Sequence, residues 1–168
     1  MSLSEDLAII AKQEQRLKFA AFDEESAWKL GSRLRQMTLA RSAPVVIDVR
    51  RFGQPLFFCA MPGSTPDNID WVRRKSNVVA RFHRSSYGLG LELQQKNTTL
   101  ADRFGLVLTE FAAHGGCFPI SLTGSGVIGS VAVSGLPQRV DHELVVEALC
   151  SELVCEYAEL KLPDARGD

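Results

Sequence analysis

Apolar positions recur with two different periods along the chain, and each change of period marks the boundary of an expected element. A period near 3.6 residues predicts helices over 4–19, from Asp23 to the Ser-Ala-Pro stretch at 42–44, and from Asp67 through 69–85. Asp23 has the side chain of a good N-cap, and the proline ends the second helix because it cannot continue one. The apolar or small residues of that helix share one face: Ala27, Leu30, Gly31, Leu34 and Met37.

Two other regions have the period of two that is typical of strands. Apolar and β-branched residues at 45–49 and 56–61 flank a turn at 52–54, which predicts a β-hairpin. The segments 114–123 and 126–135 predict two more strands, joined by a short glycine turn. The alternation therefore predicts a second hairpin in the C-terminal half.

The remaining segments complete one domain, residues 1–168. Segment 87–113 is less regular, and we expect short helices there or a strand in its second half. Asp141 is expected to cap a long final helix, and the polar residues 161–168 are expected to form a frayed tail.

The glycine turn also spells a nucleotide-binding motif, because residues 124–129 read G-x-G-x-x-G. That motif requires a helix directly after it, whose N-terminal amides and dipole hold the pyrophosphate. Here residues 127–134 alternate with period two, and no helix start occurs before Asp141. The pattern favours a hairpin in which Gly124 and Gly126 take positive φ. The small Gly129 predicts that a helix or another subunit packs closely on this strand.

Composition restricts the class of protein further. The net charge of -1 and the pI near 6.3 exclude a molecule that binds nucleic acid through its overall charge. No apolar run approaches the ~20 residues that cross a bilayer. The four cysteines form no Cys-x-x-Cys pair, and the N-terminus lacks the pattern of a signal peptide. We expect a reduced, cytoplasmic protein with neither nucleic acid nor membrane as a partner.

The most specific pattern is the C-terminal stretch 114–149, HGGCFPISLTGSGVIGSVAVSGLPQRVDHELVVEAL. It resembles the signature of the haem-degrading domain family, the GlcG-like and HbpS-like proteins, and is most similar to an uncharacterised bacterial and fungal branch. The segment 44–82 resembles the first hairpin and helix of that family, so the resemblance covers most of 25–155. The residues that carry the C-terminal match are Gly115, Gly116, Pro119, Gly126, Gly129, Ser134, Gly135, Asp141 and His142.

The resemblance implies a fold and suggests a ligand. The fold is α/β (α+β): a profilin-like antiparallel sheet with helices packed on it, in a single domain. It also implies a homo-oligomer. Haem is a candidate cofactor by resemblance alone, since some members bind or degrade it and many have no known activity.

Basic residues form the first candidate ligand site. Arg73 and Arg74 lie in the third helix, and Arg50 lies on the nearby hairpin. Arginine presents a bidentate fork to carboxylates and phosphates, so these residues are candidates for a small anionic ligand such as a haem propionate. The alternative is a solvated helix face, or salt bridges to the acidic helices at 5–25 and 141–159.

Histidines supply the second set of candidates. His83 continues the apolar stripe of the third helix, which makes it the first choice for contacting haem iron or a substrate, with a buried structural histidine as the alternative. His114 is the other candidate, but His114 and Cys117 are only two ligands, so no metal site is expected. His142 is expected to pair with a carboxylate or to contact another subunit.

Three functions remain open. The protein binds a small ligand, it is an oligomeric scaffold without one, or it is an enzyme on an unknown substrate; the sequence leans away from the enzyme. A binder requires the region of Arg73, Arg74 and His83 to face a cavity. A scaffold requires only apolar interface surfaces. An enzyme requires two titratable groups within hydrogen-bond reach of each other.

Overall fold

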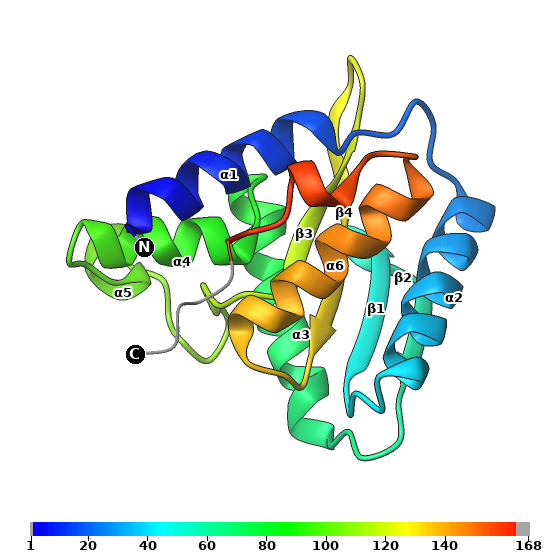
Figure 1. Ribbon diagram of the computed structural model, residues 1–168. Helices are drawn as coiled ribbons and strands as arrows, with labels where there is room; N and C mark the ends of the chain where they lie inside the picture. Colours follow the sequence, from blue (N-terminus) through cyan, green and yellow to red (C-terminus); the bar gives the residue numbers. More distant parts are fainter. Residues whose placement is uncertain (1, 164–168) are drawn as a thin grey trace.

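A single antiparallel sheet of four strands forms the centre of the protein, which a computed structural model describes over residues 2–163. The strands are β1 (Val46–Arg51), β2 (Gln54–Ala60), β3 (Cys117–Leu122) and β4 (Gly126–Ser134). Their spatial order is β2-β1-β4-β3, so the two hairpins lie side by side with β1 paired to β4 (Figure 1). Both hairpins and the mixed α/β class are as the sequence predicts.

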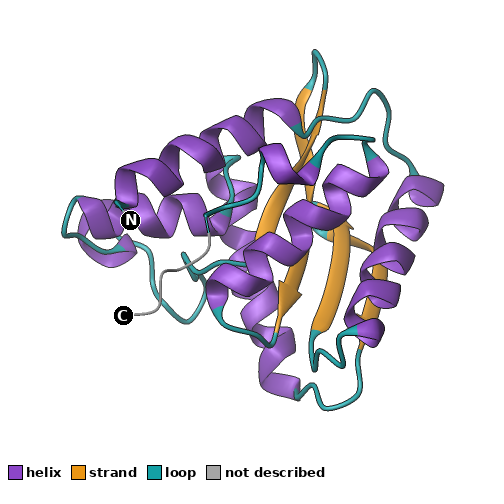
Figure 2. Cartoon of the chain, viewed as in Figure 1, coloured by secondary structure: helices purple, strands orange, loops and turns teal. Residues whose placement is uncertain are grey.

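Helices pack on both faces of this sheet (Figure 2). In chain order they are α1 (Leu3–Arg16), α2 (Glu24–Ala40), α3 (Pro66–Phe82), α4 (Ser86–Gln95), α5 (Leu100–Phe104), α6 (Gln138–Glu152) and the 3₁₀ turn η1 (Tyr157–Glu159). Helices α2 and α6 cover one face, where Ile47 and Val49 join the main core. Helix α3 covers the other face, where Val46 packs with Val72 and Val79. Alternate side chains of β1 thus pack into two cores, one on each face of the sheet.

Several element boundaries differ from the expected ones. Helix α1 ends at Arg16, three residues before the expected end. Helix α6 begins at Gln138, so Asp141 lies inside its first turn, and the expectation that Asp141 is the cap is wrong. Asp23 does cap α2, where its Oδ1 accepts from the amide of Ser26 at 2.8 Å. The less regular segment 87–113 contains the rest of α4, then α5 and turns, and it has no strand.

The glycine motif is a hairpin loop. Gly124 and Gly126 have φ of 80° and 88°, and the loop leads directly into β4 instead of into a helix. The close neighbour expected at Gly129 is the adjacent strand rather than a helix or another subunit. A Cβ at Gly129 would lie 2.0 Å from the carbonyl oxygen of Arg50 in β1.

The two ends of the described chain pack together against α6 (Figure 1). In α1, the side-chain amide of Gln13 donates to the carbonyl of Leu160 at 2.7 Å. Leu162 is buried beside Ile10 and Tyr87, which differs from the frayed tail expected over 161–168. Residues 164–168 of that expected tail lie outside the described residues. No helix in the described part is long and apolar enough to cross a membrane.

Candidate functional site

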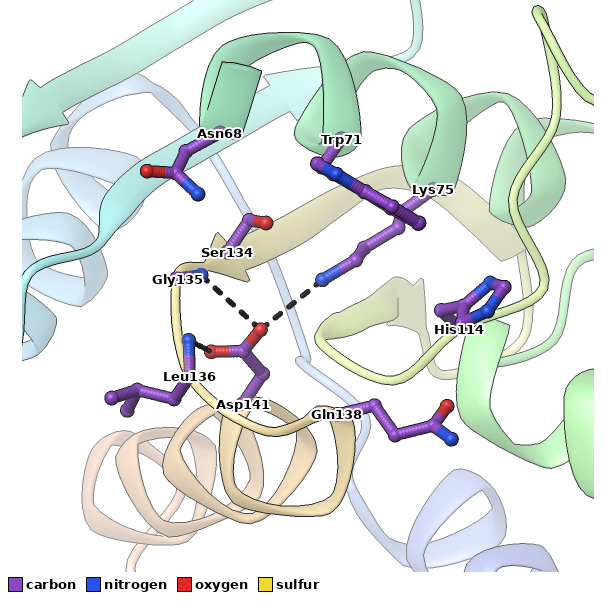
Figure 3. A pocket seen from close by; sticks show the side chains of 9 residues that line it. All are labelled: Asn68, Trp71, Lys75, His114, Ser134, Gly135, Leu136, Gln138 and Asp141. Carbon is purple, nitrogen blue, oxygen red and sulfur yellow. Dashed lines mark hydrogen bonds and ion pairs between the residues drawn. The ribbon is translucent and has the colours of Figure 1, made fainter. Parts of the chain in front are cut away.

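A polar cavity of about 400 Å³ opens where α3 meets the loop between β4 and α6 (Figure 3). Helix α3 lines it with Asn68, Trp71 and Lys75. The end of β4 and the first turn of α6 add Ser134, Gln138 and Asp141, and the loop before β3 adds His114. The cavity is therefore built from α3, within segment 44–82, and from the stretch 114–149, and both segments resemble the family.

The charged floor of this cavity is the pair Lys75–Asp141. The Nζ of Lys75 lies 3.2 Å from Oδ2 of Asp141 and 3.3 Å from the carbonyl oxygen of Val133. Asp141 also accepts from the backbone amides of Gly135 at 3.4 Å and Leu136 at 3.1 Å. The dashed lines of Figure 3 show how one carboxylate holds both the lysine and the β4–α6 loop.

Burial sets the electrostatics of this pair. The side chains of Lys75 and Asp141 are 4% and 1% exposed. Burial disfavours the charged form of each group. It lowers the pKa of Lys75 and raises the pKa of Asp141 to about 6, while the ion pair opposes both shifts. Two titratable groups within hydrogen-bond reach of each other thus stand at the floor of a cavity, as the enzyme hypothesis requires.

The backbone conformation and the close neighbours of residue 116, which lies beside this pair, require a glycine. Its φ is 119°, and a Cβ there would lie 2.3 Å from the carbonyl oxygen of Val133 and 2.9 Å from Nζ of Lys75. A side chain at this position would displace the lysine or the strand. Gly116 therefore contributes to the site through the space that it leaves.

A second, largely apolar cavity of about 440 Å³ adjoins the first. Residues of α4 and of the loop after α5, among them three leucines, form most of its wall, and Arg74 also lines it. Trp71, His114 and Gln138 line both cavities, so they form the boundary between them. The rings of Trp71 and His114 pack edge to face with centroids 5.1 Å apart. Partial burial lowers the pKa of His114, and the positive charges of Lys75 and Arg74 lower it further. Both effects favour the neutral imidazole.

Of the predicted arginines, only Arg74 faces a cavity, and all three have carboxylate partners. Arg50 pairs with Asp48 at 2.6 Å. Arg73 pairs with Asp70 and Glu110 at 2.9 and 2.8 Å. Arg74 pairs with Asp70 and lies 4.1 Å from the centre of the Trp71 ring. All three arginines thus form salt bridges, but the expectation that the acidic helices at 5–25 and 141–159 supply the partners is wrong for them.

The expected position of His83 is wrong. The residue ends α3 in a left-handed conformation with φ of 55°, is exposed, and lies away from the residues that line the two cavities. Its ring lies 6.0 Å from that of Phe52 at the tip of the first hairpin. Once the chain leaves the helix, the helical spacing that placed His83 on the apolar stripe no longer applies.

The partner of His142 also differs from the expected one. His142 is fully buried, and its Nε2 is 2.8 Å from Oε1 of Gln13, so its partner is neither a carboxylate nor a subunit. Burial raises the pKa of Cys117 to about 12, which leaves the thiol protonated. Within residues 2–163, the His, Cys, Asp and Glu side chains form no group of three that could hold a metal ion.

Sequence reasoning missed the residues at the centre of the site. Lys75 is not among the ligand residues that the sequence predicts, and Asp141 is expected there as a helix cap. One signal was present: Lys75 lies three residues after Val72 and four before Val79, on the buried stripe of α3. A lysine at a buried position requires a partner. That the partner comes from residue 141 is decided only by the packing of α3 on β4.

The comparison with known families decides the membership of this chain. The sequence model of the family described as "Haem degrading protein HbpS-like" matches residues 22–150. The chain belongs to this family. A UPF0303 protein of Acidobacterium capsulatum is 61% identical over 165 residues, which cover 98% of this chain and all of that relative. One of Burkholderia mallei is 62% identical over 162 residues, which cover 96% and 98% of the two chains.

Solved structures show how this family member folds. The Ybr137w protein superposes with a TM-score of 0.82 at 28% identity, over 88% of this chain and 87% of that one. HbpS gives a TM-score of 0.61 at 19% identity, over 80% and 91% of the two chains. A structure described as a PduOC:haem complex gives 0.67 at 15% identity, over 78% and 94%. At these two lower identities the likeness concerns the fold alone.

Proposed function

We propose that the protein binds a small molecule in the two cavities that meet at His114, and that haem or another flat anionic molecule is its ligand. The observation that carries this proposal is the position of His114 between a polar cavity and an apolar one. A ligand with an apolar body and polar substituents matches such a pair of cavities. Membership of the haem-degrading family and the haem-bound fold neighbour support haem as the first ligand to test.

The residues around His114 fit haem in three respects. The lowered pKa of His114 keeps its ring neutral, which is the form of imidazole that coordinates iron. The leucine-lined cavity offers an apolar wall to a porphyrin. Arg74, at the side of that cavity, offers a guanidinium to a carboxylate, in competition with Asp70.

A haemin titration tests this proposal. The purified full-length protein is titrated while the Soret band is recorded, alongside His114→Ala and the matched control His83→Ala. We expect a saturable, stoichiometric shift that His114→Ala abolishes and His83→Ala retains, because only His114 faces the cavities. A weak, non-saturating shift that is identical in all three proteins would contradict the proposal. It would leave the scaffold as the better hypothesis.

We also infer that the chain associates with further copies of itself through the α3 side of the sheet. Phe58 of β2 is 48% exposed, and it pairs with Asp48 of β1. The next residue of β1, Val49, faces the main core, so Asp48 and Phe58 face the opposite, α3 side of the sheet. Phe52 and Ile69 are 39% and 45% exposed on the neighbouring hairpin tip and α3. Large exposed apolar side chains such as Phe58 are common in interfaces between subunits.

A further inference from the structure

The polar cavity contains a lysine whose amine is placed to react with a ligand. Its Nζ donates to two acceptors among the described residues, the carboxylate of Asp141 and the carbonyl of Val133. An ammonium has three N–H bonds, so one is left for a ligand. Figure 3 shows the amine directed toward the middle of the ring of labelled side chains, with Trp71 above it and Asp141 below.

We propose that Lys75 is a nucleophile in the polar cavity, where it condenses with a small aldehyde or ketone that carries a polar group and forms an imine. This inference goes beyond haem binding. It depends only on the polar cavity admitting a ligand, and not on His114 as a ligand for iron.

The reaction balances with the groups present. The ammonium of Lys75 passes one proton to the carboxylate of Asp141 across the 3.2 Å contact. The free amine then forms a C–N bond to the carbonyl carbon, and the π electron pair of the carbonyl moves to its oxygen. A proton shifts from the nitrogen to that oxygen, and the Asp141 carboxyl gives its proton to the same oxygen, which leaves as water. The products are an iminium on Lys75, an Asp141 carboxylate and one water, and neither oxidant nor reductant is consumed.

The contacts of the pair argue against a purely structural role. A buried ion pair adds little stability compared with apolar residues of similar volume, because both charges must lose their hydration. Lys75 and Asp141 also line an open cavity of about 400 Å³ instead of being sealed in the core. Burial lowers the pKa of Lys75, which increases the fraction of reactive amine at neutral pH.

The lining of the cavity indicates the class of carbonyl compound. Asn68 and Gln138 provide side-chain amides, and Ser134 provides a hydroxyl, so hydroxyl, carboxylate or amide substituents of a ligand would find partners. Trp71 adds a flat apolar wall. These groups favour a short polar aldehyde or 2-oxo acid over a long aliphatic one.

Reductive trapping on the full-length protein tests the proposal. Pyruvate and glycolaldehyde are the two probes, and cyanoborohydride reduces any imine to a stable secondary amine. The modified residue is identified by peptide mass mapping. Burial lowers the pKa of Lys75 and so raises its amine fraction, and the amine faces the cavity, so we expect Lys75 to be labelled faster than the exposed Lys29. Lys75→Arg keeps a cation opposite Asp141 but should lose this labelling, while the matched control Lys29→Arg should keep it.

Several outcomes would overturn the inference. Labelling of Lys75 no faster than that of Lys29 with both probes is one, and unchanged total labelling in a folded Lys75→Arg or Lys75→Met variant is another. The site mapping uses the wild-type protein, so it decides the question even if neither variant folds. A haemin shift that requires His114, together with no label on Lys75, would overturn this inference alone. A label on Lys75 without a haemin shift would overturn only the haem proposal.

Discussion

At the scale of single residues, the site depends on a buried charge that has a partner of opposite charge and on glycines where no larger residue fits. Lys75 is tolerated inside the protein because Asp141 lies beside it, and Asp141 is held by two backbone amides as well. Gly116 leaves the space for Lys75, and Gly129 allows β1 and β4 to approach. The same physical reason applies to both glycines: each faces a carbonyl oxygen at a distance that no side chain allows.

The first residue-scale prediction concerns Gly129→Ala. The new Cβ would lie 2.0 Å from the carbonyl oxygen of Arg50, in a pair of central strands that cannot separate without losing ladder hydrogen bonds. We expect the free energy of unfolding to fall by about 3 kcal/mol in a urea titration, the upper range for overpacking. Gly53→Ala is the matched control, because a Cβ at Gly53 meets no atom within 4 Å. Equal stability of the two variants would show that β1 and β4 are spaced differently.

At the scale of elements, two helices connect the core to the site. Helix α3 turns Val72, Lys75 and Val79 toward the sheet, while its Arg73 and Arg74 pair with acids away from the sheet. Helix α6 contributes Asp141 to the cavity, while the next residue, His142, points to α1. Gln13 of α1 joins this contact and also binds the carbonyl of Leu160. The first and last parts of the described chain therefore stabilise the helix that carries Asp141.

The element-scale prediction is a pH dependence caused by His142. Burial lowers its pKa to about 3, so the folded state holds the ring neutral while the unfolded chain takes up a proton below about pH 6.5. Stability contributed in this way is present above pH 6.5 and is lost as the pH falls. Between pH 7.5 and pH 5, we expect the stability advantage of the wild type over His142→Asn to shrink by about 2 kcal/mol.

Urea titrations at the two pH values measure this difference. Subtracting the variant from the wild type removes the contributions of other groups, such as Asp141, whose raised pKa acts with the opposite sign. His83→Asn is the control, because His83 is exposed, and its difference from the wild type should stay nearly constant. A constant difference for His142→Asn as well would mean that the ring is hydrated or protonated in the folded protein.

At the scale of the whole molecule, the sheet has unequal cover on its two sides. Helices α2 and α6 lie over one face, and α3 lies over the β1–β4–β3 part of the other. Phe58 on β2 therefore remains exposed on the α3 side. The residues that line the two cavities come from α3, α4, α5, α6, the end of β4 and the adjoining loops, and none of them lies on β2 with Phe58.

The whole-molecule prediction concerns the size of the particle in solution. We expect light scattering after size-exclusion chromatography to give a mass that is a multiple of the 18.5 kDa chain. Phe58→Asp should shift the mass toward the monomer, because a charge in an apolar interface is poorly solvated. Leu108→Asp is the control, since Leu108 is also a large exposed apolar residue but lines the apolar cavity. A monomeric wild type, or a variant of unchanged mass, would contradict association through this surface.

The sequence by itself determined the local structure. Period-two alternation predicted both hairpins, the period of 3.6 predicted α2 and α3, and the absence of a helix after residue 129 excluded a dinucleotide loop. These features depend on near neighbours in the chain, which share a face or a turn whatever the rest of the molecule does. The glycines of the C-terminal stretch likewise indicated the family.

Only the tertiary structure decided the site. It placed Lys75 beside a carboxylate 66 residues away, put His114 between two cavities, and left His83 in solvent. It also showed that Arg50, Arg73 and Arg74 are paired with acids. A residue type and its spacing along a helix give the face on which a side chain lies, but not the residue it meets across a layer. That depends on how α3 and α6 pack on the sheet, which is set by the shape of the whole core.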